Sequence, residues 1–264
     1  MFDVLLESPE FAIAMFFVLG LLGSFANVVI YRLPAEKSVV RPRSSCQACG
    51  KTIPWCDNVP IASWFVRRGR CRFCQARFSF RYPVVELLTA CLFAVCFAVD
   101  GWSWSLLEHL LFIWALVVCT FIDFDHMILP DEFTLSGIVI GLIGAALNPD
   151  RSFWDALAGF LLGGGFLWFM AWLYYALTGN EGMGGGDIKL LGWIGAVLGA
   201  MSIPYVILVS AVTGSLLGLA LAIGQKRGLK TVIPYGPYLA LGAVSYIFGG
   251  WTLAQRYWGF FLPN

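Results

Sequence analysis

Long apolar runs recur along almost the whole chain and are separated by short polar turns. Hydrophobic residues make up 59% of the 264 residues and charged residues only 12%, and the mean hydropathy is +0.78. A soluble domain averages about 25% charged residues, so this composition does not suit a water-facing surface. A helix needs about 20 apolar residues to cross a bilayer. The pattern therefore predicts an all-α polytopic membrane protein with about eight transmembrane helices.

The expected helices divide the chain into three parts. We expect them at residues 11–31, 83–99, 105–122, 132–147, 153–177, 188–201, 205–224 and 235–253. Residues 1–31 then form the first transmembrane helix, residues 32–82 a small polar domain, and residues 83–264 a seven-helix membrane domain. The fourth and sixth runs are short, which tilting or shielding by neighbouring helices would accommodate. Closely spaced glycines within 159–165 and 192–199 predict seams where helix backbones approach each other.

The basic residues indicate how the helices are oriented. Of the 17 Lys and Arg residues, 11 lie between Arg32 and Arg81, and a second basic cluster lies at 226–230. Basic segments beside apolar helices mark the cytoplasmic side. The first segment lacks the alternation of aromatic and basic residues that favours single-stranded nucleic acid, so we expect no nucleic-acid partner. Eight crossings would place both termini on the other side of the membrane.

Four cysteines in the polar domain form two Cys-x-x-Cys pairs. Cys46 and Cys49 are separated from Cys71 and Cys74 by 21 intervening residues. Two such pairs can present four thiolates tetrahedrally to Zn²⁺. Disulfide or redox use is the alternative, and a reducing cytoplasm disfavours it. Because sulfur would occupy all four positions, no site remains for an activated water, and the predicted zinc is structural.

Two aspartates lie where apolar runs break, on the same predicted side of the membrane. Asp123 directly follows the run 105–122, and Asp187 directly precedes the run 188–201. A carboxylate beside hydrocarbon is costly, which suggests a functional role. Two carboxylates at one site cannot both ionise cheaply, so one can act as a base on water while the other acts as an acid. The pattern predicts an aspartic protease within a bilayer, although Asp125 could replace Asp123 and either carboxylate could merely cap a helix.

The glycine-rich turn before Asp187 suggests how a substrate is held. It reads GMGGGD over residues 182–187. Glycine allows another backbone to come close and permits positive φ. An extended peptide could lie along such a turn as an added strand. We therefore expect Gly184, Gly185 and Gly186 to contact the substrate.

Two other functions remain open on these residues. A membrane transporter could use paired functional aspartates and glycine-broken helices, although transporter sites lie near the bilayer midplane rather than at one face. A zinc adaptor could use the helices only as an anchor, which leaves the aspartates unexplained. A Ser-His-Asp triad has no clear support, because the chain has only two histidines, His109 and His126.

Several motifs together resemble one known family. They are GSFANVVIYRLP (23–34), the two Cys-x-x-Cys pairs with WCDNVP (55–60) between them, RYPVVE (81–86), IDFDHMILPD (122–131), EGMGGGDIKL (181–190) and PYGP (234–237). The chain resembles the type IV prepilin peptidases, which are bifunctional leader peptidases and N-methyltransferases among the GxGD aspartic membrane proteases. The matching stretches run nearly from end to end, and their combination is highly specific.

The resemblance implies a function and a location. It implies removal of the leader from type IV prepilins and pseudopilins at the cytoplasmic face of the bacterial inner membrane, with both termini periplasmic. Asp123 and Asp187 match the catalytic pair. The tetracysteine domain is characteristic of members that also methylate the new N-terminus with S-adenosylmethionine. A peptidase without methyltransferase activity is the alternative, and no motif places the methyl donor. Asn27 and Glu86 fall within matching stretches without an assigned role.

Overall fold

The computed structural model describes residues 9–225 and 233–261, and these residues form helices without any strand. Two isolated antiparallel bridges, Ser45 with Thr52 and Arg70 with Arg77, lie in the polar segment. The predicted helical class is therefore confirmed for the described residues. Both termini and the basic cluster at 226–230, on which the orientation depends, lie outside them. The chain divides into two compact units, Met1–Val118 and Cys119–Asn264.

Helices lie at all eight predicted positions. Their bounds are α2 (Pro9–Arg32), α4 (Arg81–Asp100), α5 (Trp104–His126), α6 (Asp131–Leu147), α7 (Phe153–Thr178), α8 (Gly185–Leu198), α9 (Ser202–Gln225) and α10 (Gly236–Ser245). Among the described residues, α4, α5, α7 and most of α9 are long and apolar enough to cross a membrane. Since α6 has 17 residues and α8 has 14, the count of eight crossings stays a prediction.

The last expected crossing differs from the prediction, because residues 235–253 do not form one continuous helix. The helix α10 ends at Ser245 and is followed by a π-helical segment, η2 (Tyr246–Gly250), and then by α11 (Trp251–Phe261). Within η2, Gly249 has a φ of 125°. Only glycine adopts this φ readily, so the backbone breaks at this residue. The residues on both sides of the break are apolar, so the hydropathy pattern did not indicate it.

The first unit joins two apolar helices to the polar segment. α2 packs against α4, and a Cβ atom added to Gly23 would lie 2.8 Å from the Glu86 Cα atom. The indole N–H of Trp114 donates a hydrogen bond to the Leu22 carbonyl oxygen at 2.9 Å. The polar segment between α2 and α4 holds only two short helices, η1 (Trp55–Asp57) and α3 (Ala62–Val66).

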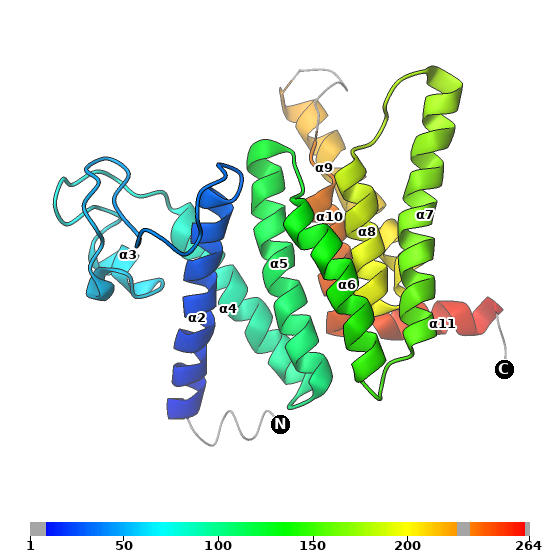
Figure 1. Ribbon diagram of the computed structural model, residues 1–264, viewed down its shortest axis with the longest axis horizontal. Coiled ribbons are helices and arrows are strands. Elements are labelled where there is room, and N and C mark those ends of the chain that lie inside the picture. Colours follow the sequence, from blue (N-terminus) through cyan, green and yellow to red (C-terminus); the bar gives the residue numbers. More distant parts are fainter. Residues whose placement is uncertain (1–8, 226–232, 262–264) are drawn as a thin grey trace. The chain divides into compact units, whose positions relative to one another are not determined.

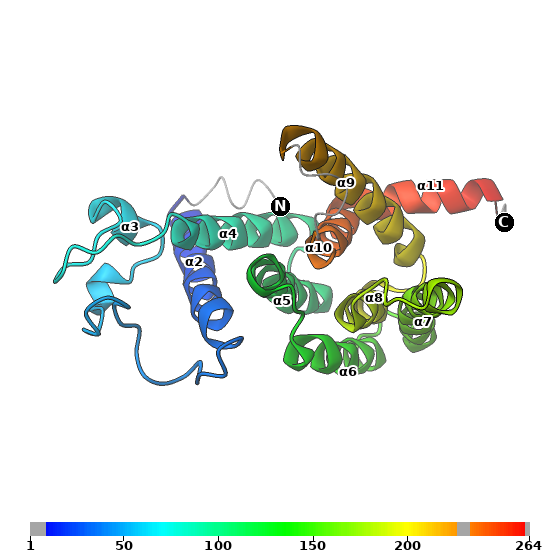
Figure 2. The same ribbon diagram turned by 90° about the horizontal axis from the view of Figure 1, so that it is seen from above.

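The second unit is organised around α8. Figures 1 and 2 show α8 between α6 and α7. A Cβ atom added to Gly195 would lie 2.1 Å from the Gly159 carbonyl oxygen, and one added to Gly137 would overlap the Trp193 ring. The predicted glycine seam is therefore confirmed where α7 meets α8, whereas a Cβ atom added to Gly165 would meet nothing within 4 Å. Neighbouring helices bury α8 from Leu190 to Val197, which lets a short apolar helix avoid solvent.

The order of the helices brings several turns together within the second unit. α5 ends, and α6 and α8 begin, at the same end of this unit (Figure 1). The two segments that carry the predicted catalytic aspartates, the end of α5 and the start of α8, therefore lie on one side.

Candidate functional site

Asp123 is a buried carboxyl group in the last turn of α5. Its residue surface is only 5% exposed. The Gly236 N–H donates a hydrogen bond to its Oδ2 atom at 3.1 Å. A buried carboxylate is stabilised by such a donor, because burial removes the water that would otherwise solvate it. Gly236 begins α10, so this contact joins segments 113 residues apart.

Asp187 lies in the first turn of α8 and is partly buried. Burial and, to a smaller extent, the negative charge of Asp123 together raise the pKa of the Asp187 carboxyl group to about 7. The two predicted acids therefore lie close enough to influence each other electrostatically. A like-charged pair of this kind favours a state in which the two carboxyl groups share one proton.

Leu129 links three segments around the carboxyl pair. A Cβ atom added to Gly186 would lie 2.9 Å from the Leu129 Cβ atom, and one added to Gly236 would lie 3.2 Å from its Cδ2 atom. The turn after α5 therefore packs against the starts of both α8 and α10. Only glycine fits at positions 186 and 236 without a shift of the neighbouring atoms.

The segment before α10 also reaches the site. The Tyr235 hydroxyl lies 2.7 Å from the Ser210 hydroxyl of α9. The next residue, Gly236, donates the hydrogen bond to the Asp123 Oδ2 atom. Sequence reasoning placed no functional residue here, although PYGP (234–237) was among the recognised motifs. A Pro-Tyr-Gly-Pro run beside an apolar segment was the available signal.

The glycine turn adopts an ordinary backbone conformation. Gly184 is the N-cap of α8 with a φ of −70°, and Gly185 and Gly186 begin the helix. Positive φ occurs upstream instead, at Gly179, which caps the end of α7. A Cβ atom added to Gly185 would meet nothing within 4 Å. The turn therefore has an open side at Gly185 and a packed side at Gly186.

The other polar residues considered in the sequence pair with one another rather than with the two aspartates. The Lys189 ammonium group donates to the Asp131 Oδ1 atom at 2.6 Å on the exposed surface. Asp131 begins α6, directly after Pro130 at the N-cap position. His109 lies far along α5 from Asp123, with its Nδ1 atom 2.7 Å from the Asp100 Oδ2 atom.

The four predicted zinc ligands form one cluster. The Sγ atoms of Cys46, Cys49, Cys71 and Cys74 all lie within 4.8 Å of one another. The Cys46 and Cys74 Sγ atoms are 3.7 Å apart, which is too far for a disulfide of about 2.05 Å. Zn–S bonds of about 2.3 Å place the sulfurs of a tetrahedral site about 3.8 Å apart. The donor atoms and their spacing therefore fit a zinc ion.

The two cysteine loops repeat the same backbone arrangement. The Cys46 N–H bonds to the Lys51 carbonyl, and the Gly50 N–H bonds back to the Cys46 carbonyl; residues 71, 75 and 76 repeat this pattern. The residue after the second cysteine has positive φ in both loops, 70° at Gly50 and 59° at Gln75. Hydrogen bonds from the backbone N–H groups of Cys74 and Phe73 lower the pKa of Cys71 to about 6, whereas burial and hydrogen bonds with the neighbouring cysteines raise the pKa of Cys74 to about 11.

The helices and the site define a class: a polytopic membrane protein with a paired-carboxylate site in one unit and a tetracysteine cluster in the other. The family profile described as "Type IV leader peptidase family" matches residues 110–219. The profile described as "Bacterial Peptidase A24 N-terminal domain" matches residues 18–99. These two matches cover the segments that hold the carboxylates and the cysteines.

Curated relatives cover nearly the full chain. A "Prepilin leader peptidase/N-methyltransferase" of Aeromonas hydrophila is 39% identical over 90% of this chain and 90% of its own. Proteins of the same name from Stutzerimonas stutzeri and Pseudomonas aeruginosa are 38% and 36% identical, over 94% and 97% of this chain and 94% and 96% of theirs. The chain belongs to the type IV leader peptidase family. No solved structure shows a significant match.

Proposed function

We propose that this chain removes the leader from type IV prepilins and pseudopilins and N-methylates the new N-terminal residue. The observation that carries the peptidase assignment is the pair formed by the buried Asp123 and by Asp187, whose charges interact. The names of the close relatives, which join the two activities, support the methyltransferase assignment. Peptidase activity alone is the second candidate.

The carboxyl pair suits hydrolysis by general acid–base catalysis. The ionised carboxylate takes a proton from water, the resulting hydroxyl attacks the scissile carbonyl carbon, and the protonated partner donates a proton to the carbonyl oxygen. When the C–N bond breaks, the leaving nitrogen takes the proton that the first carboxylate removed from water, and the second carboxylate takes back a proton from a hydroxyl group of the tetrahedral intermediate. The Gly236 N–H takes one lone pair of the Asp123 Oδ2 atom, so the Oδ1 atom and a second Oδ2 lone pair remain for the reaction.

We infer an inner-membrane location with the carboxyl pair at the cytoplasmic face and both termini in the periplasm. The four helices that are long and apolar enough to cross a bilayer support the membrane location. The dense Lys and Arg residues of 32–82 support the orientation through the positive-inside rule. The partners are then the lipid bilayer and the prepilin substrates, and no nucleic acid is involved.

Mass spectrometry of one reaction tests both activities. Purified protein in detergent is incubated with a full-length prepilin, with and without S-adenosylmethionine. We expect loss of the leader mass in both reactions and an added methyl group only with the methyl donor. Leader loss without methylation would support the second candidate, and an unchanged prepilin mass would contradict the proposal.

We propose that Cys46, Cys49, Cys71 and Cys74 hold a structural zinc ion in the domain of residues 32–82. Purified protein should contain about one Zn²⁺ per chain, and Cys71→Ser should lower that content because it removes a buried ligand. Elemental analysis measures the ratio. Cys91→Ser, which changes an exposed cysteine of α4 outside the cluster, is the matched control and should keep its zinc. Metal-free wild-type protein with four freely alkylated thiols would contradict the assignment.

We propose that Gly184, Gly185 and Gly186 contact the substrate backbone. Gly185 tests this best, because its added Cβ atom would enter open space. Gly185→Ala should leave the melting temperature unchanged while raising the KM for prepilin about tenfold, since it crowds an approaching backbone.

Gly186→Ala is the comparison variant, because its Cβ atom would lie 2.9 Å from Leu129. It should lower the melting temperature as well as activity. An unchanged KM in the Gly185→Ala protein would show that the substrate does not lie along the turn.

A further inference from the structure

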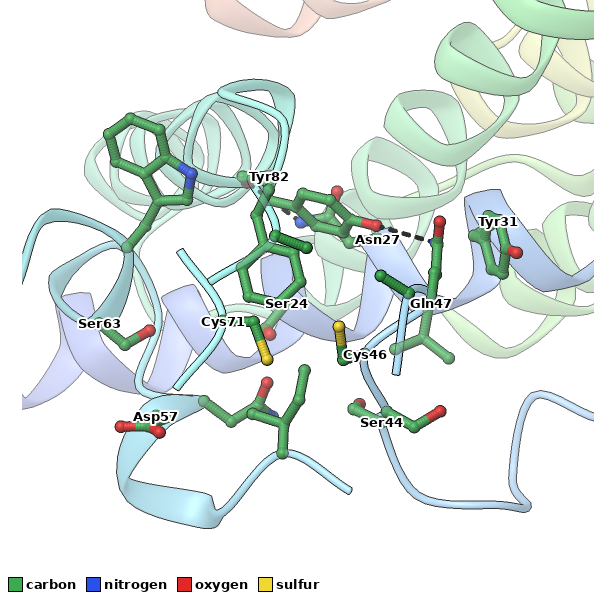
Figure 3. A pocket seen from close by; sticks show the side chains of 18 of the residues that line it. Ser24, Asn27, Tyr31, Ser44, Cys46, Gln47, Asp57, Ser63, Cys71 and Tyr82 are labelled. Atoms are coloured by element: carbon green, nitrogen blue, oxygen red, sulfur yellow. Dashed lines mark hydrogen bonds between the residues drawn. The ribbon is translucent and has the colours of Figure 1, made fainter. Parts of the chain in front are cut away.

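Two clusters of side chains of the kind that bind metals lie near opposite ends of α4 in the first unit. Near the start of α4, the tetracysteine cluster borders a cavity of about 930 Å³, which the end of α2, the polar segment and Glu86 also line. Figure 3 shows Cys46 and Cys71 pointing into this cavity, with Asn27 and Tyr82 beside them. The second cluster lies outside the cavity, where α4 ends and α5 begins, and neither proposed activity uses it.

The second cluster consists of Cys96, Asp100 and His109. Cys96 and Asp100 lie one turn apart on the same face of α4, because residues at i and i+4 are neighbours on a helix. Gly101, with a φ of 61°, follows the last residue of α4, and the short turn 101–103 leads into α5. This turn places His109, in the second turn of α5, beside the last turn of α4.

The three ligand atoms converge on one largely buried point. The His109 Nδ1 atom lies 2.7 Å from the Asp100 Oδ2 atom, and the Cys96 Sγ atom lies 3.3 Å from the same oxygen. Cys96 is fully buried, and all three atoms lie within 4.8 Å of one another. In a tetrahedral Zn²⁺ site, bonds of about 2.0–2.3 Å place sulfur, nitrogen and oxygen ligands about 3.4–3.6 Å apart. Small side-chain movements therefore bring the three atoms to coordinating distance.

The electrostatics of this point favour a cation. Asp100 is the last residue of α4, and the last turn of this helix contains no basic residue. The C-terminal end of a helix carries a partial negative charge, so a carboxylate there is destabilised unless a cation compensates it. The Cys96 thiol does not supply that charge, since it is a weak and neutral hydrogen-bond donor. A protonated His109 paired with Asp100 is the alternative, and it leaves the convergence of the thiol on the same oxygen unexplained.

We propose that Cys96, Asp100 and His109 bind a second zinc ion, which joins the end of α4 to the start of α5. The thiolate and the carboxylate balance the 2+ charge of the ion, so the complex is neutral and suits a buried position. Binding forms three coordinate bonds and releases the thiol proton of Cys96 to water, while the neutral imidazole keeps its hydrogen on Nε2. The fourth position of the tetrahedron remains for a water molecule.

This site differs from the tetracysteine site in strength and in place. A single thiolate and an open position predict weaker binding than four thiolates, so dialysis should remove the second ion and leave about one Zn²⁺ per chain. His109 precedes Asp123 by 14 residues in α5, about 21 Å along the helix axis, so the ion takes no direct part in leader cleavage. Under the inferred orientation, the turn 101–103 lies on the periplasmic side.

Cobalt titration of the purified, dialysed full-length protein tests this proposal. Co²⁺ bound to a thiolate absorbs light by sulfur-to-cobalt charge transfer, whereas the d¹⁰ ion Zn²⁺ has no such visible signature. The wild type should bind about one Co²⁺ per chain with this absorption. Its zinc content should stay at about one per chain, because Zn²⁺ binds more tightly than Co²⁺. A wild-type protein that takes up no Co²⁺ would overturn the proposal.

Two variants identify the ligands while keeping a hydrogen-bond donor for Asp100. Cys96→Ser replaces the thiol by a hydroxyl, so it should lose the charge-transfer absorption and raise the Kd for Co²⁺ at least about tenfold. His109→Gln replaces the imidazole by an amide and should raise the Kd to a similar extent. A wild-type Kd in both variants, or an unchanged absorption in the Cys96→Ser protein, would overturn the proposal by assigning the Co²⁺ to the tetracysteine site.

Matched controls lie in the same two helices. Cys91→Ser changes an exposed cysteine of α4, and His126→Gln changes an exposed histidine at the end of α5, and neither residue belongs to the cluster. Both should bind Co²⁺ like the wild type. Zinc content and melting temperature before Co²⁺ is added show whether each variant is folded.

Thermal unfolding gives a second readout that does not depend on colour. Added Zn²⁺ should raise the melting temperature of the dialysed wild type, because an ion that binds only the folded state stabilises it. It should not raise that of Cys96→Ser or His109→Gln, and an equal rise in all three proteins would overturn the proposal. Because no measurement involves prepilin, the proposed peptidase and methyltransferase activities stand or fall separately.

Discussion

Asp123→Asn and Asp187→Asn should each lower leader cleavage by about 10²–10⁴-fold, the usual contribution of a general acid or base. Asparagine keeps the shape of the side chain but can neither take a proton from water nor donate one to the scissile carbonyl oxygen. Each change leaves a single carboxyl group, which cannot perform both transfers. The rate of leader loss from a prepilin, followed by mass spectrometry, measures the effect.

The matched control for these variants is Asp125→Asn. Asp125 is an exposed acid only two residues from Asp123. Its variant tests whether the loss of any acid in this turn is enough to lower leader cleavage. It should retain wild-type cleavage. All three proteins should accumulate in the membrane to the same level, because no large apolar contact is removed. Full activity in either the Asp123 or the Asp187 variant would refute the carboxyl-pair mechanism.

Gly236→Ala should lower kcat for leader cleavage by about 10²-fold, because a displacement of about 1 Å at a catalytic group has an effect of this size. The added Cβ atom would lie 2.6 Å from the Asp123 Oδ2 atom. The carboxyl group must therefore move away and lose the N–H bond that orients it. The steady-state kinetics of prepilin cleavage give kcat and KM separately.

Gly165→Ala provides the control for the Gly236 change. It makes the same substitution in α7, where the new Cβ atom meets nothing within 4 Å. It should match the wild type in kcat, KM and melting temperature. If Gly236→Ala kept full kcat, the contact between α10 and Asp123 would have no part in catalysis.

The contact between Gly236 and Asp123 also shows where sequence reasoning reached its limit. The break in hydropathy at Asp123 was visible within a few residues, because a carboxylate beside hydrocarbon stands out locally. The partner that orients the carboxyl group lies 113 residues away. Its donor is a backbone N–H, which every residue except proline possesses, so no residue type identifies it. The same holds for Leu129, whose packing against two glycines depends on how α8 and α10 are placed.

The tetracysteine cluster illustrates the opposite case. Two Cys-x-x-Cys pairs predict a tetrahedral sulfur site from spacing alone, because each short loop can direct two sulfurs to one point. The structure brings these four Sγ atoms within 4.8 Å. The cavity beside them was not predictable, since its lining combines residues from the end of α2, the polar segment and the start of α4.

The amino-acid sequence by itself determined the helical class, the approximate helix positions and the chemical groups available, because apolar length, charge and ligand spacing act over a few residues. Tertiary structure alone decided which groups meet. It supplied the break at Gly249, the packing of α8 between two neighbours, the backbone donor to Asp123 and the cavity around Glu86. The packing of α8, the donor to Asp123 and the cavity depend on contacts between segments distant in the chain, and such contacts leave no local pattern.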